Sequence, residues 1–209
     1  NSHATVLCFS DKGKVYWLKV YQIPQASRSA KGRPMVNILP LGGEERITAV
    51  LPIAEFTNNH FVFMATANGT VKKTPLEQFS RPRASGLIAL DLEEDNWLVG
   101  AAITDGKSDI LLCSSSGKAV RFAESDVRSM GRSAKGVRGI KLAKDHNVIS
   151  LSVPQEGGRL LTASSNGFGK CTELVEFPTK GRGGQGVIAM QTSQRNGDLV
   201  GAVQVFGSD

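Results

Sequence analysis

An internal repeat of about fifty residues constrains the fold of this chain more than any other feature. A glycine that ends a basic segment recurs at spacings of 54, 50 and 50 residues, at Gly32, Gly86, Gly136 and Gly186. A turn glycine after an apolar run recurs at spacings of 56, 48 and 50 residues, at Gly13, Gly69, Gly117 and Gly167. A third landmark, an apolar run after polar residues, reads "EERITAVLPI", "EDNWLVGAAI", "DHNVISLSV" and "NGDLVGAVQV". These landmarks predict a single domain over residues 1–209, built from similar units at roughly residues 1–50, 51–100, 101–150 and 151–203.

Each unit is predicted to be a small β-sheet. The apolar runs are short, rich in Val, Ile, Leu and Phe, and bounded by Gly, Asn, Ser and Asp. The turns "ANGT", "SSGK" and "SNGF" are typical of hairpins, while "LEQFS" and "AESDVRSM" indicate a helical turn before the basic segment. A sheet this small cannot bury both faces alone, so the units should stack. We therefore expect an all-β, propeller-like array of four-stranded blades.

Basic residues gather at two places in each unit, in a chain with 25 Lys and Arg against 19 Asp and Glu. One place follows the turn glycine and contains Lys72, Lys73, Lys118, Arg121 and Lys170. The other is the loop that ends at the second glycine and contains Arg28, Lys31, Arg33, Arg81, Arg83, Arg132, Lys135, Arg138, Lys180 and Arg182. Equivalent positions of stacked repeats lie on equivalent faces, so we expect the basic residues to form a belt.

Such a belt suits the phosphate backbone of duplex DNA. Lys and Arg replace condensed counterions, and glycine lets main-chain N–H groups approach phosphate. The loops contain no aromatic residues for stacking single strands and few side chains that read base edges. The pattern favours a duplex held, and bent, by shape and charge. The alternative is a propeller-type protein-interaction module whose charges only keep its rim soluble.

Other chemistry finds little support in the sequence. Three scattered histidines and the widely spaced Cys8, Cys113 and Cys171 lack metal-ligand spacing, so we expect no metal site. The odd cysteine count favours a reducing compartment such as the cytoplasm. No apolar run reaches 18 residues, so no membrane-spanning helix and no membrane partner are expected. "KGRGGQG" lacks the ending of a nucleotide-binding loop, and we predict no catalytic residue.

Several segments closely resemble the C-terminal domain of the A subunit of bacterial DNA gyrase, over essentially the whole chain. They are "GKVYWLKVYQIPQASRSAKGRPMVNILPL", "FMATANGTVKKT", "VRSMGRSAKGVRGIKL" and "EFPTKGRGGQGVIAMQ". The resemblance implies a β-pinwheel, a propeller-like ring of usually six blades that wraps duplex DNA around its outer rim. It also implies that the basic residues named above contact DNA, and that the domain supports negative supercoiling without being catalytic itself. The equivalent domain of topoisomerase IV shares this architecture and stays an alternative.

The same resemblance implies partners and a location. ATP and Mg²⁺ belong to other parts of the gyrase holoenzyme, so no cofactor is expected here. The implied partners are double-stranded DNA, the gyrase B subunits and the catalytic part of the A subunits in an A2B2 enzyme of the bacterial cytoplasm. The piece by itself is expected to be monomeric.

One departure concerns the family's hallmark heptapeptide, Q-R-R-G-G-K-G, which is absent. The nearest segment is a degenerate copy in the fourth repeat, formed by Lys180, Gly181, Arg182, Gly183, Gly184, Gln185 and Gly186. Both ends of the chain fall inside a repeat, so we expect about four blades of a longer array. DNA binding is expected of this piece, whereas full wrapping is not.

Overall fold

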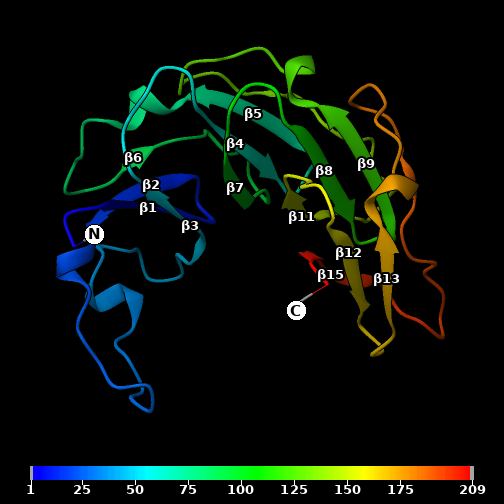
Figure 1. Cartoon of the computed structure of the whole chain (residues 1–209), viewed down its shortest axis with the longest axis horizontal. Coiled ribbons are helices and arrows are strands. Elements are labelled where there is room, and N and C mark those ends of the chain that lie inside the picture. The colour runs from blue at the N-terminus through cyan, green and yellow to red at the C-terminus, as the bar shows by residue number, and fades with distance from the viewer. Residues whose placement is uncertain (1, 208–209) are drawn as a thin grey trace.

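The computed structural model describes residues 2–207, and its strands form four antiparallel sheets (Figure 1). The first sheet has the order β3-β1-β2-β6, with β1 Thr5–Ser10, β2 Lys14–Lys19, β3 Ile47–Ile53 and β6 Leu87–Ile88. The second has the order β7-β4-β5-β10, with β4 Phe61–Thr66, β5 Thr70–Pro75, β7 Leu98–Thr104 and β10 Val137–Arg138. The third has the order β11-β8-β9-β14, with β8 Asp109–Ser114, β9 Lys118–Ala123, β11 Val148–Ser152 and β14 Val187–Ile188. The fourth has three strands, in the order β15-β12-β13, with β12 Arg159–Ser164, β13 Gly169–Glu173 and β15 Leu199–Val205.

The sequence landmarks correspond to strands as predicted. Each turn glycine closes a hairpin, β1–β2, β4–β5, β8–β9 or β12–β13, and has a positive φ between 73° and 88°. Glycine adopts this conformation without the steric cost that a Cβ would add. The apolar run after the polar residues becomes the third strand of its sheet, β3, β7, β11 or β15. The all-β, propeller-like prediction is therefore confirmed.

The outermost strand of a sheet comes from the following repeat, which the sequence did not reveal. Strands β6, β10 and β14 each belong to one repeat but pair with β2, β5 and β9 of the repeat before. The carbonyl oxygen of the turn glycine stabilises this pairing, because it accepts two backbone hydrogen bonds from the residues that follow the added strand. For example, the amides of Ala89 and Leu90 lie 2.9 and 3.1 Å from the oxygen of Gly13. A repeat of about fifty residues is thus not a complete sheet.

The sheets follow one another along an arc (Figure 1). The strands β3, β7, β11 and β15 contact one another in that order along its inner side. Apolar side chains fill the space between neighbouring sheets. Leu7 and Met64 share one cluster between the first two sheets, Phe63 and Leu112 a second, and Leu111 and Leu160 a third. Each sheet therefore depends on its neighbour for its core, as expected of stacked repeats.

Short 3-10 helices complete the structure. They are η1 Val20–Gln22, η2 Met35–Asn37, η3 Leu76–Phe79, η4 Glu124–Asp126 and η5 Leu174–Glu176. The helical turns predicted at "LEQFS" and "AESDV" are η3 and η4, and both come just before a basic loop. Within residues 2–207, no helix has the length and apolarity needed to cross a membrane.

Candidate nucleic-acid interface

Three basic loops lie on the same outer edge of the array. The loops 80–86, 129–136 and 179–186 each run directly into β6, β10 or β14. These strands are the edge of their sheets farthest from the inner strands β3, β7 and β11. Six cations of these segments are exposed and Arg132 is half-buried. The exposed ones are Arg81, Arg83, Lys135, Arg138, Lys180 and Arg182.

Arginines from two repeats meet in one groove. A depression of about 420 Å³ between the loops 80–86 and 129–136 is lined by Arg81, Arg83 and Arg132. One carboxylate, that of Glu77, shares the lining. Guanidinium groups bind phosphate oxygens through paired N–H donors. The groove can therefore accept a polyanion that spans two repeats.

Acidic side chains border this edge. A second depression of about 180 Å³ brings Lys135 and Arg138 beside Asp91 and Glu93 of the preceding repeat. Acids here reduce the positive potential beyond the loop, because opposite charges within several ångströms attenuate one another's field. The positive surface is thus a strip along the loops rather than a whole face.

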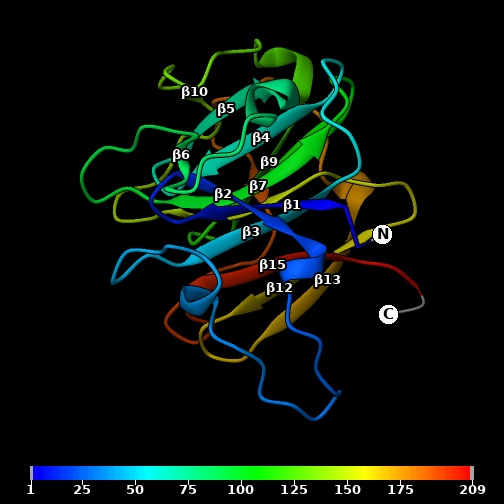
Figure 2. The ribbon, with the colours of Figure 1, turned by 90° about the vertical axis from the view of Figure 1, so that its left-hand side faces the viewer.

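The first basic loop does not join the other three. Arg28, Lys31 and Arg33 are exposed, but residues 24–34 form no strand and extend away from the sheets (Figures 1 and 2). The later loops are held by the hairpin of the preceding repeat. Residues 2–207 contain no hairpin before β1 to hold this one. The structure therefore brings together three of the four loops that we expected to share one edge.

Lys72 and Lys73 are not on the rim, and the prediction that they contact DNA is wrong. Lys72 is fully buried, and its Nζ donates hydrogen bonds to the carbonyl oxygens of Ala89, at 3.0 Å, and Arg132. Burial, followed by the positive charge of Arg132, lowers the pKa of Lys72 to about 8, although Asp91 acts in the opposite direction. Lys73 is 6% exposed, and its Nζ lies 3.2 Å from the carbonyl oxygen of Glu124.

The other cations after the turn glycines differ from one another. Arg121 is half-buried, with Nε 2.8 Å from Asp109 Oδ2 and Nη1 3.1 Å from the carbonyl oxygen of Leu174. The guanidinium of Arg121 therefore has protein partners already, and its predicted contact with DNA stays a prediction. Lys118 is half-buried and donates to Gln185 Oε1 at 3.3 Å. Lys170 is exposed on β13.

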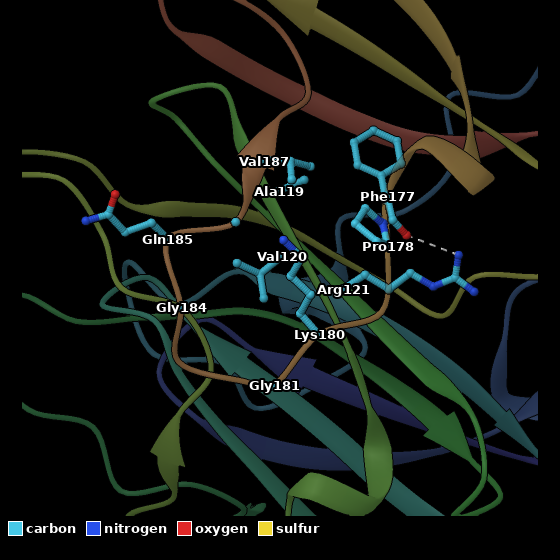
Figure 3. Close-up of a pocket in the computed structure, with 11 residues that line it drawn as sticks. Ala119, Val120, Arg121, Phe177, Pro178, Lys180, Gly181, Gly184, Gln185 and Val187 are labelled. Atoms are coloured by element: carbon cyan, nitrogen blue, oxygen red, sulfur yellow. Dashed lines mark hydrogen bonds between the residues drawn. The ribbon is translucent and has the colours of Figure 1, made fainter.

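The degenerate heptapeptide, residues 180–186, forms a loop around Val120 and Arg121 (Figure 3). It encloses a largely apolar pocket of about 250 Å³ with Ala119, Val120 and Phe177. Gly186 is required at its end, because its φ is +76° and a Cβ there would lie 2.1 Å from the carbonyl oxygen of Ala119. Gly186 therefore serves close backbone packing, whereas a Cβ at Gly181 or Gly184 would meet nothing within 4 Å.

Two exposed cations on the same edge were missed in the sequence. Arg128 precedes the loop 129–136, and Lys141 follows β10. The amide of Lys141 donates a 2.8 Å hydrogen bond to the carbonyl oxygen of Gly184, which places it against the next loop. Their closeness to the basic loop in the sequence was the available signal.

Comparison with known proteins relates the whole chain to one family. A family model described as "DNA gyrase C-terminal domain, beta-propeller" matches residues 4–54, 60–105, 108–155 and 158–205. The DNA gyrase A subunit of Klebsiella oxytoca is 56% identical over 209 residues, which is 100% of this chain and 24% of that protein. The DNA gyrase A subunit of Escherichia coli (strain K12) is 52% identical over the same share of both chains. The chain thus spans about a quarter of the length of these relatives.

Solved structures share the fold. The C-terminal domain of DNA topoisomerase IV superposes with a TM-score of 0.88 at 29% identity, covering 98% of this chain and 64% of that one. A DNA gyrase A C-terminal domain superposes with a TM-score of 0.81 at 24% identity, covering 98% and 67%. Since the family model accounts for each of the four repeats, this chain belongs to the DNA gyrase C-terminal domain family.

Proposed function

We propose that this chain binds and bends duplex DNA along the edge formed by the loops 80–86, 129–136 and 179–186. The observation that carries this proposal is that loops of like charge occupy the same outer position on three consecutive sheets. A duplex is a regular polyanion, so a ligand of that kind can meet equivalent cations in every repeat. A protein partner gives no reason for this regular recurrence of positive charge.

The arc of the sheets supports bending. A duplex that contacts all three loops follows the outer side of the arc (Figure 1). Bending 20–30 bp by 40–90° costs about 1–6 kcal/mol, so contacts in several repeats are needed to offset it. If seven loop cations each neutralise one phosphate, log K falls against log salt with a slope of about −6.

Within the whole enzyme, we infer an accessory role without catalysis. The relatives are A subunits of DNA gyrase, and this chain corresponds to about a quarter of them. In that setting the domain supports ATP-dependent negative supercoiling in the bacterial cytoplasm, together with the B subunits and the catalytic part of the A subunits. ATP and Mg²⁺ act in those other parts, and the domain by itself is a monomer without a cofactor.

A role in topoisomerase IV is the second candidate, because the topoisomerase IV C-terminal domain superposes with a TM-score of 0.88. Grafting this chain onto the catalytic part of a gyrase A subunit that lacks its own domain separates the two. Restored negative supercoiling supports gyrase. Efficient decatenation without supercoiling supports topoisomerase IV.

Fluorescence anisotropy with a labelled duplex of about 40 bp tests DNA binding itself, at about 50 and about 200 mM salt. We expect tight binding at the lower salt and, with a slope of about −6, a loss of about 4,000-fold at the higher, together with end-to-end energy transfer that reports bending. No binding at low salt, or binding indifferent to salt, would instead support a protein-interaction module.

A further inference from the structure

One position recurs in the inter-repeat contacts, the residue four places after each turn glycine. In the first three repeats it is Trp17, Lys73 and Arg121. Each side chain donates a hydrogen bond to a main-chain carbonyl in the 3-10 segment of the following repeat. The distances are 2.7 Å from Trp17 Nε1 to Phe79, 3.2 Å from Lys73 Nζ to Glu124, and 3.1 Å from Arg121 Nη1 to Leu174.

The main chain at this position also holds the next basic loop. The carbonyl oxygen of Lys73 accepts a 2.8 Å hydrogen bond from the amide of Met130, and that of Arg121 a 2.9 Å hydrogen bond from the amide of Lys180. One strand residue thus bonds to both the 3-10 helix and the start of the loop that follows it. In the fourth repeat the position is the exposed Cys171, and residues 2–207 contain no later 3-10 helix for it to bind.

Acidic partners orient the two cations. Asp109 Oδ2 lies 2.8 Å from Arg121 Nε and also accepts a 2.8 Å hydrogen bond from Thr179 Oγ1 at the start of the next loop. Glu124 Oε1 lies 3.8 Å from Lys73 Nζ. Figure 3 shows the Arg121 side chain directed toward the carbonyl of Phe177. These cations are therefore engaged by protein groups.

We propose that Trp17, Lys73 and Arg121 are inter-repeat clasps that position the following basic loop for DNA, and that the two cations do not themselves neutralise phosphates. This inference rests on the proposed function for its DNA part. Nearby cations such as Lys135 contact the duplex, whereas the clasps set the spacing between consecutive loops. A clasp and a phosphate contact then differ in their effect on the salt dependence of binding.

Two variants separate these roles, Arg121→Met and Lys135→Met. Lys12→Met is the control, because it removes one exposed charge from the β1–β2 turn. Replacing a phosphate contact reduces the salt slope by about 0.9. We expect Lys135→Met to do this. Arg121→Met should instead weaken binding about tenfold at every salt concentration without changing the slope, because the loop loses its position.

Amide hydrogen exchange gives a readout that does not depend on DNA. In Arg121→Met the amides of Phe177 and Lys180 should exchange about tenfold faster, whereas Lys135→Met and Lys12→Met leave them unchanged. A reduced salt slope with unchanged exchange would make Arg121 a phosphate contact and overturn the proposal. Faster exchange with unchanged DNA affinity would overturn the claim that Arg121 positions the loop for DNA. If the wild-type chain does not bind DNA, the proposed function is wrong. The hydrogen-exchange data alone then show whether Arg121 holds the following loop in place.

Asp109→Asn provides a second test if Arg121→Met does not fold. The change removes a negative charge, so simple electrostatics predicts tighter DNA binding. A clasp predicts weaker binding, because Arg121 and Thr179 lose their shared carboxylate. Tighter binding of this variant would count against the positioning role.

Discussion

The guanidinium Nη1 of Arg182 donates a 3.0 Å hydrogen bond to the carbonyl oxygen of Arg138. Its Nε donates a second hydrogen bond, of 2.9 Å, to the carbonyl oxygen of Asp126. The amide of Gly183 lies 2.7 Å from the carbonyl oxygen of Gly139 in the same contact. The third and fourth basic loops are therefore joined through main-chain groups, and the spacing between them is fixed by the protein before DNA binds.

Replacing Arg182 should weaken the contact between the third and fourth basic loops. We expect Arg182→Met to cost about 1 kcal/mol of unfolding free energy, because two hydrogen bonds from a charged but exposed donor are lost. Urea unfolding measures this cost, and the amides of Gly183 and Lys141 should exchange faster. The exposed Lys135→Met variant is the control and should stay within about 0.5 kcal/mol of wild type. Equal stability of the two variants would show that the Arg182 contacts add nothing.

Reversing the charge of the third loop should weaken DNA binding. Arg132, Lys135 and Arg138 all replaced by Glu should lower affinity at least about a hundredfold at low salt and make the salt slope shallower by about 3. Anisotropy titrations at several salt concentrations measure both quantities. Far-ultraviolet circular dichroism should be unchanged, because the hydrogen bond between Lys72 and Arg132 uses the main-chain oxygen of Arg132 and not its side chain. Unchanged affinity would remove this loop from the interface.

The turn glycines offer a matched pair of substitutions. Gly117 and Gly167 have φ of +79° and +81°, so alanine is strained at both. A Cβ at Gly117 would lie 2.0 Å from the carbonyl oxygen of Met190, whereas nothing lies within 4 Å at Gly167. We expect Gly167→Ala to cost about 1 kcal/mol, and Gly117→Ala to cost several times more by displacing β14. Equal losses in urea unfolding would contradict a role for this carbonyl contact.

Lys72 should give the protein a stability that rises at alkaline pH. Its pKa falls from 10.5 to about 8 on folding, so the unfolded chain binds the proton more tightly. The penalty for the buried charge is fully present below pH 8, is relieved between pH 8 and 10.5, and is absent above that range. Unfolding measured from pH 7 to 10 in wild type and Lys72→Met isolates this contribution. Parallel curves for the two proteins would refute it.

The strands were predictable because their signals are local. Turn residues such as Gly69 and the short apolar runs around them specify hairpins with little help from the rest of the chain. The 3-10 turn at Leu76–Phe79 was likewise visible in its own segment. Repetition at about fifty residues then predicted stacked sheets, because each sheet leaves an apolar face that a neighbour must cover.

The candidate site was only partly predictable. Lys72, Lys73 and Lys135 are alike in the sequence, as cations near glycines in the same repeat pattern. Their surroundings differ because Lys72 and Lys73 are covered by Arg132 and Glu124 from the next repeat, while Lys135 is exposed. No local pattern records which segment from fifty or sixty residues away will lie over a side chain.

By itself, the sequence determined that this protein is an array of similar β-hairpin units with basic loops, since turn formation and hairpin pairing depend on neighbouring residues. Only the tertiary structure decided that the second, third and fourth repeats each contribute the outermost strand of the sheet before. Contacts with the 3-10 helix and the loop of the next repeat also bury Lys72 and Lys73 and turn Arg121 toward Leu174. The physical reason is that burial and hydrogen-bond partners depend on contacts between distant segments, which exist only once the sheets have stacked.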